Sequence, residues 1–97
     1  MRIRLLPEAE REVLDATSYL ADQSEGAAER FLEELADAKD RVLQFPNGGS
    51  RIGKGARRLL FRRHSYQLIY CVTADEIVVI AVAHLSRRPN YWRKRET

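Results

Sequence analysis

The stretch YQLIYCVTADEIVVIAVAH, residues 66–84, decides the fold of this 97-residue chain. It contains two runs rich in aliphatic and aromatic residues, 66–73 and 77–84, separated by a short polar break. Runs of this length and composition are typical of strands, and a short break between two of them is typical of an antiparallel hairpin. A third run of the same kind, residues 57–63, precedes them, and His64-Ser65 separates it from the run at 66–73. The three runs predict an antiparallel meander.

Upstream of the meander, the apolar residues follow the period of a helix. They recur at helical spacing in residues 7–25 and again in residues 27–43, with Gly26 between the two segments. Pro7 suits the first position of a helix, where a missing N–H costs nothing. Residues 1–6 alternate between apolar and basic side chains, as in a strand with one buried face. The predicted order is β-α-α-β-β-β, an α+β fold with a helix hairpin packed on one face of a small, mainly antiparallel sheet.

Residues 47–55 are predicted to form a loop between the helices and the meander. The segment contains four glycines together with Arg51 and Lys54. It lacks the Gly-x-x-x-x-Gly-Lys-Ser/Thr spacing of a loop that cradles nucleotide phosphates. A flexible connector is the favoured interpretation, and its basic side chains remain available to phosphates.

Size and composition indicate an ordinary globular protein. The length predicts a single domain over residues 1–97. An apolar content of 44% with 32% charged residues excludes a disordered chain. The longest apolar run, 77–83, is too short to span a bilayer, and residues 1–10 show no signal-peptide pattern. A single cysteine excludes an internal disulfide and a cysteine-based zinc site. We therefore expect a cytoplasmic protein with no membrane partner, no metal and no cofactor.

The charge is distributed unevenly along the chain. Residues 1–46 carry six basic and eleven acidic side chains, a net charge of −5. Residues 47–97 carry eleven basic and three acidic side chains, a net charge of +8. The positive half favours nucleic acid, an acidic protein surface or an acidic peptide as partner, whereas the alternative is a solvated basic surface.

The candidate functional residues gather near the end of the chain, in AVAHLSRRPNYWRKR, residues 81–95. Suppose that both hairpin loops contain two residues, 64–65 and 74–75. Alternation along the strands then places His64 and His84 on the sheet face away from the helices, with Arg62 and Gln67 beside them. The two imidazoles would converge there on one small group. A one-residue slip in the second hairpin would instead send His84 to the helix side.

The element order and several motifs resemble the RelE/ParE family of toxins from type II toxin–antitoxin modules. The motifs are PEAE (7–10), AAERFLEEL (27–35), FPNGG (45–49), YQLIYCV (66–72) and VAHLSRRPNYW (82–92). The resemblance covers essentially the whole chain, and its helix hairpin and strand motifs lie nearer the ParE-like branch.

The resemblance implies a small basic toxin that is neutralised by an antitoxin whose C-terminal segment wraps around it. ParE-type members poison DNA gyrase, so the first interpretation is a non-enzymatic toxin that binds a protein target, plausibly gyrase. An acidic antitoxin segment would fold onto the open sheet face and the basic tail. The residues expected to bind it are Tyr91, Trp92, Gln67 and Arg58. The alternative for Trp92 is that it packs the tail back on the sheet.

RelE-type members cut messenger RNA in the ribosome, so the second interpretation is an endoribonuclease. His84 and His64 would be its acid and base, and Tyr91 would stack on a base or donate a proton. The full Lys, Arg and Tyr set of the ribonuclease members is not matched, and both histidines also suit purely structural roles. A plain nucleic-acid-binding module is the third interpretation. The residues expected to bind a target or phosphate are Arg62, Arg63, Arg87, Arg88, Arg93, Lys94 and Arg95.

Overall fold

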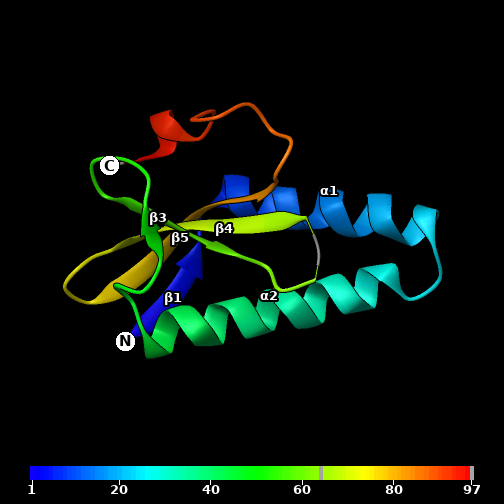
Figure 1. Ribbon diagram of the computed structural model, residues 1–97, viewed down its shortest axis with the longest axis horizontal. Coiled ribbons are helices and arrows are strands. Elements are labelled where there is room, and N and C mark those ends of the chain that lie inside the picture. The colour runs from blue at the N-terminus through cyan, green and yellow to red at the C-terminus, as the bar shows by residue number, and fades with distance from the viewer. Residues whose placement is uncertain (64, 97) are drawn as a thin grey trace.

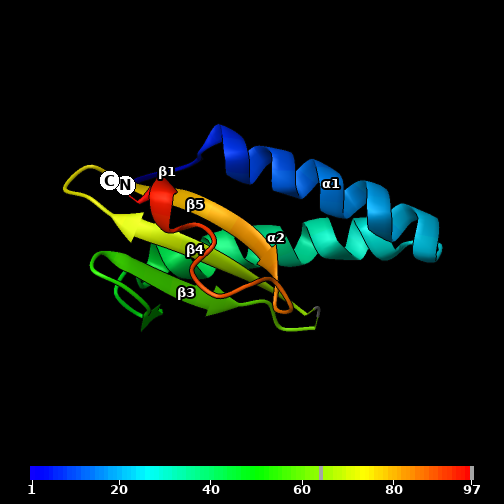
Figure 2. The ribbon, with the colours of Figure 1, turned by 90° about the horizontal axis from the view of Figure 1, so that it is seen from above.

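The computed structural model describes residues 1–63 and 65–96. A five-stranded sheet with the order β1-β5-β4-β3-β2 forms its centre. The helices α1 and α2 pack on one face of this sheet, and the C-terminal segment with the short 3₁₀ helix η1 lies on the other (Figure 1; Figure 2). The elements are β1 (Arg2–Leu5), α1 (Pro7–Gln23), α2 (Ala27–Gln44), β2 (Ser50–Arg51), β3 (Ala56–Leu60), β4 (Tyr66–Val72), β5 (Glu76–His84) and η1 (Arg93–Arg95). The predicted α+β class and helix hairpin are confirmed.

The additional strand is β2, which lies in the segment predicted to be a loop. Its two residues pair antiparallel with Arg57 and Arg58 of β3. The preceding turn is fixed by Tyr70, whose hydroxyl donates to the Pro46 carbonyl at 2.9 Å and accepts from the Gly49 N–H at 3.0 Å. A flexible connector is therefore the wrong description of this segment, because a buried tyrosine fixes one end of it and pairing with β3 fixes the middle.

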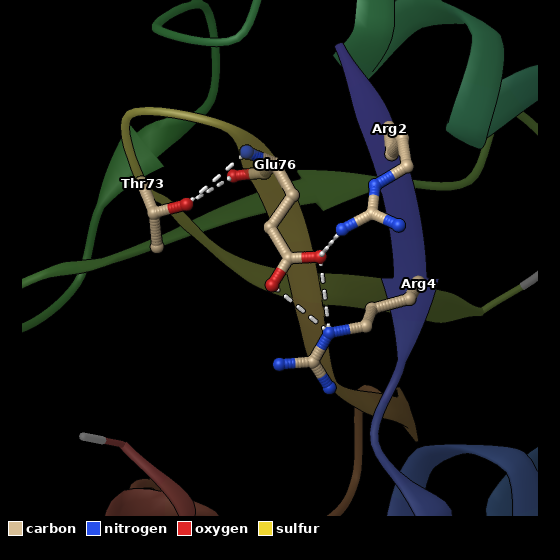
Figure 3. Close-up of polar contacts among 4 residues, drawn as sticks. All are labelled: Arg2, Arg4, Thr73 and Glu76. Atoms are coloured by element: carbon tan, nitrogen blue, oxygen red, sulfur yellow. Dashed lines mark hydrogen bonds and ion pairs between the residues drawn. The ribbon is translucent and has the colours of Figure 1, made fainter.

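Strand β1 joins the sheet at its edge, parallel to β5. Glu76 is the first residue of β5, and its carboxylate accepts hydrogen bonds from Arg4 Nε at 3.0 and 3.1 Å (Figure 3). The same carboxylate lies 3.6 Å from the Arg2 guanidinium. Thr73 closes the adjoining turn, because its N–H donates to the Glu76 carbonyl at 2.9 Å and its hydroxyl accepts from the Glu76 N–H at 3.1 Å. Arg2 and Arg4 thus serve to hold β1 and are paired with an acid.

The main core lies between the sheet and the helices. Phe31 of α2 is fully buried, with its ring centroid 4.9 Å from that of Tyr66 and 5.6 Å from that of Phe61. The other buried members of this core are Ala9, Ala16, Leu35, Ala38, Val42, Leu68, Tyr70, Ile77, Val79 and Val82. Burial of each large apolar side chain contributes roughly 1.5–3 kcal/mol, so this layer supplies most of the driving force for folding.

The first hairpin is longer than the predicted two-residue loop. Leu60 pairs with Gln67, and the Phe61 N–H donates to the Tyr66 carbonyl at 2.9 Å. Strand β3 therefore ends at Leu60, before the predicted boundary at residue 63. Because the register moves by two residues relative to the prediction, each side chain keeps its predicted face.

The second hairpin begins in the predicted register and then changes it. Val72 pairs with Ile77 and Tyr70 with Val79, but Ile69 pairs with Ala81, so a bulge leaves Ile80 without a partner on β4. An extra residue in one strand exchanges the two faces from that point onward. His84 pairs with Tyr66 and faces the helices. Its predicted place on the outer face is wrong.

Candidate functional site

The segment after β5 folds back across the outer face of the sheet (Figure 2). Trp92 anchors it and is only 3% exposed. The indole packs in a second cluster with Ala56, Ile69, Val78, Ile80 and Ala81 of strands β3, β4 and β5. The interpretation in which Trp92 packs the tail on the sheet is confirmed. The candidate site is therefore a platform made of the outer sheet face and its covering tail.

The carboxylate of Glu12, on α1, binds this tail through hydrogen bonds. It accepts from the Tyr91 hydroxyl at 2.6 Å, from Arg95 Nη1 at 3.0 Å and from the Val82 N–H at 3.0 Å. The Glu12 side chain is 13% exposed. Charge-assisted hydrogen bonds of this kind are about twice as strong as neutral ones, so one carboxylate ties α1, β5 and the tail together.

The position of Glu12 follows from the short edge strand. Leu5 is the last residue of β1 and pairs with Val79. Beyond that point β5 continues, and its backbone N–H and C=O groups on this edge have no partner in β1. Glu12 binds the N–H of Val82, and Arg95 Nη1 donates to the carbonyl of Ile80 at 3.1 Å. Backbone groups that lose a strand partner need such replacements when they are covered.

Glu12 was not among the candidate functional residues predicted from the sequence. The signal was its spacing. Glu12 lies three residues after Ala9 and four before Ala16, and both alanines are buried on the face toward the sheet. A carboxylate between two small residues of a core stripe is placed to reach inward.

Tyr91 is held in its neutral form. Burial, followed by the hydrogen bond to Glu12, raises the pKa of the Tyr91 hydroxyl well above its usual value. The Arg87 guanidinium stacks on the same ring with its central carbon 3.9 Å from the ring centroid. Such cation–π contacts contribute about 0.5–1 kcal/mol at exposed sites. The neutral Tyr91 hydroxyl therefore serves as a hydrogen-bond donor to Glu12, which holds the tail in place.

The raised pKa of Tyr91 predicts a dependence of stability on pH. An unfolded tyrosine ionises near pH 10, whereas the folded Tyr91 keeps its proton to higher pH. Its contribution is complete below about pH 10 and is lost as pH rises further, because the unfolded chain releases the proton first. We expect the difference in unfolding free energy between the wild type and Tyr91→Phe to shrink between about pH 9.5 and 11. Urea unfolding across this range measures it, and a difference that stays constant would contradict the assignment.

His84 lies in a small pocket between β5 and α1. The pocket has a volume of about 190 Å³, and its lining includes Tyr19, Tyr66 and Arg87. The imidazole meets the Tyr66 ring edge-on at 5.2 Å, and its Nδ1 accepts the Ser86 N–H at 3.0 Å. Because Nδ1 is an acceptor, the neutral ring carries its proton on Nε2. His84 is thus an exposed donor with a fixed tautomer.

The predicted group of His84, His64, Arg62 and Gln67 does not form as expected. Arg62 turns toward α2, where its Nε lies 3.1 Å from Asp37, and this bond is the main cause that lowers the pKa of Asp37. Gln67 pairs with Ala83 and remains on the outer face, opposite to His84. His64 lies outside the described residues. The bulge in β5 and the acidic face of α2 are the physical reasons for this separation.

Exposed cations surround the tail. Within residues 1–63 and 65–96, no carboxylate pairs with Arg88, Arg93 or Lys94, and all three are exposed. Arg87 lies 4.0 Å from the Glu12 carboxylate, and the half-buried Arg95 forms an ion pair with the same carboxylate. Arg58 is exposed, and the Arg63 N–H donates to Glu34. The same part of the chain contains no group of three His, Cys, Asp or Glu side chains that would suit a metal ion.

Comparison with known proteins places the chain in a family. Residues 3–89 match the model described as "ParE toxin of type II toxin-antitoxin system, parDE". The chain belongs to the ParE toxin family. Its relatives include Toxin ParE2 of Mycobacterium tuberculosis, 30% identical over 90 residues that cover 92% of this chain and 86% of the relative. Toxin RelE3 of Caulobacter vibrioides is 28% identical over 89 residues, covering 89% and 97%.

A solved structure of the ParE fold also matches. The structure titled "Chromosomal ParDE TA system from P. aeruginosa" superposes with a TM-score of 0.73 at 17% identity, covering 87% of this chain and 95% of that one. The likeness confirms the fold, and the family match confirms the resemblance inferred from the motifs. Within the described residues, neither helix of this ParE-family chain has the length and hydropathy needed to cross a membrane.

Proposed function

We propose that this ParE-family chain arrests growth by binding DNA gyrase and that a cognate antitoxin neutralises it in the cytoplasm. The observation that carries the proposal is the fixed tail. Trp92 and Glu12 hold the segment on the sheet. The exposed Arg88, Arg93 and Lys94 lie on this segment, and no carboxylate of the described residues forms an ion pair with them. Cations on a preorganised platform suit recognition of an acidic protein surface, because little ordering entropy is lost on binding.

The positions of the candidate catalytic groups support binding in preference to proton transfer. Tyr91 donates its proton to Glu12 in a half-buried hydrogen bond. His84 faces α1, whereas Arg62 is bound to Asp37 on α2. A general acid and base must both reach the reacting group within hydrogen-bond distance.

The antitoxin is proposed to approach the same outer face. By strand register Arg58 and Gln67 lie on this face, with Arg58 exposed and Gln67 half-buried, so an acidic segment would bind them directly. Trp92 is buried beneath its own tail, so the antitoxin would contact it only after displacing that segment. A partly disordered partner would offset its ordering cost by charge complementarity with the tail.

A ribosome-dependent mRNA endonuclease is the second candidate. It is favoured by the similarity to Toxin RelE3 and by the exposed His84 with its proton on Nε2. In that case the imidazolium form of His84 would act as the general acid through its Nε2–H, and Arg87 and Arg88 would bind phosphate.

His84→Ala separates the two candidates. Under the binding proposal, the variant is expected to arrest growth within about twofold of the wild type, because His84 lies away from the outer face. The measurement is the growth rate after induction, with the protein level checked in each culture. Ser86→Ala, which removes a neighbouring hydroxyl, is the matched control. Loss of growth arrest in His84→Ala alone, with antitoxin binding intact, would favour the endonuclease.

A further inference from the structure

A second basic feature lies at the edge of the sheet, where the β2–β3 hairpin meets the end of the tail. It is a cavity of about 320 Å³ at the end of the β2–β3 hairpin, and three of its lining side chains are Arg51, Lys54 and Arg57. The rest of the lining is Asn47, Gly55, Ala56 and Val72, so no carboxylate faces it. Arg51 pairs with Arg57, and Arg57 pairs with Tyr70 of the helix-side core. The two arginines therefore share the helix-side face.

Arg57 is fixed in place at this cavity. Its Nη1 donates to the carbonyls of Asn47 at 3.0 Å and Gly49 at 2.9 Å. The Tyr70 hydroxyl also holds this turn, because it donates to the Pro46 carbonyl and accepts from the Gly49 N–H. Nη1 uses both its protons in this way, and no acceptor in the described chain contacts Nε or Nη2 of Arg57. Those two nitrogens form the planar fork that binds two oxygens of a phosphate.

The charges around the cavity are not compensated by the protein. Within the described ranges, no acidic side chain forms an ion pair with Arg51, Lys54 or Arg57. One carboxylate does reach the hairpin, since Glu96 accepts the Gly55 N–H at 2.9 Å, but it does not line the cavity. Three like charges around one hollow repel each other, and a polyvalent anion relieves that repulsion.

We propose that this cavity binds the diphosphate group of a nucleotide. Three cations match a diphosphate better than a single carboxylate, and the arginine fork with a nearby lysine is a frequent combination for phosphates. A volume of about 320 Å³, at the lower end of small-ligand sites, favours a compact group over an extended backbone. The site adjoins the end of the tail but uses the cations of the β2–β3 hairpin, so it does not depend on the proposed target.

Isothermal titration of the purified chain with inorganic pyrophosphate tests this site. We expect a dissociation constant below about 1 mM at about 150 mM NaCl. The variant Arg51→Gln/Lys54→Gln should weaken binding at least tenfold. The matched pair Arg93→Gln/Lys94→Gln removes the same charge from the tail and should leave binding within twofold. Equal weakening by both pairs, or no binding by about 10 mM, would overturn the proposal.

Two competitors identify the source of the diphosphate. ADP should displace pyrophosphate, whereas a single-stranded oligonucleotide without terminal phosphates should not. Displacement by the oligonucleotide but not by ADP would overturn the assignment in favour of a nucleic-acid surface. Thermal unfolding of each variant checks that the fold is retained. Should the double variant unfold, Lys54→Gln at the exposed hairpin is expected to weaken pyrophosphate binding about threefold, and unchanged binding would count against the site.

Discussion

Replacing Glu12 by alanine is expected to lower the free energy of unfolding by about 3–5 kcal/mol. The change leaves the Arg95 guanidinium, the Tyr91 hydroxyl and the Val82 N–H without their shared acceptor, in a largely buried place. Removing one member of a buried charged group is costly because the partners stay desolvated. Urea unfolding measures the effect, followed by the fluorescence of Trp92, the only tryptophan. The emission should shift to the red if the tail leaves the sheet.

Glu10→Ala is the matched control for Glu12→Ala. Both residues lie in the first turns of α1, but Glu10 is exposed and no described side chain pairs with it. Its replacement should change the unfolding free energy by less than about 0.5 kcal/mol. A loss below about 1 kcal/mol for Glu12→Ala would contradict the role of Glu12 as the tail's anchor.

Trp92→Ala is expected to cost about 3–5 kcal/mol of unfolding free energy. The indole fills the outer cluster against Ile80 and Ala81, so truncation removes its buried area and leaves a cavity or an uncovered sheet face. Urea unfolding followed by far-UV circular dichroism measures the loss, because the fluorescent probe is absent from this variant. Increased binding of a hydrophobic dye should accompany it.

Phe45→Ala provides the comparison for Trp92→Ala. Phe45 is also a large aromatic residue, but it is 70% exposed at the end of α2. Its loss should cost about 1 kcal/mol or less, since little buried area is removed. Similar costs for the two variants would contradict the packing of the tail on the sheet.

Periodicity in the sequence was enough to predict the helices and the strands of the meander. Apolar spacing predicted α1 and α2 to within about a turn, because one face of each helix must be buried. Strand β2 was missed because it is only two residues long and lies in a glycine-rich segment. Its formation depends on pairing with β3, which is a tertiary contact.

The bulge in β5 could not be predicted from the sequence. Residues 77–83 are apolar at every position, so the strand carries no alternation that would mark a change of face. One extra residue at Ile80 then placed His84 beside α1 instead of beside Gln67. The predicted group around His84 was therefore wrong, whereas a functional site at the tail stays a prediction.

The most direct measurement of the proposed function is gyrase supercoiling in the presence of the purified protein. We expect inhibition that rises with toxin concentration and is relieved by the antitoxin. The Arg88→Gln/Arg93→Gln/Lys94→Gln variant should lose at least tenfold in potency, because these cations form the proposed contact. In a parallel translation reaction, ribosome-bound message should remain intact. Undiminished supercoiling together with cleaved message would contradict the proposal and identify the chain as a ribonuclease.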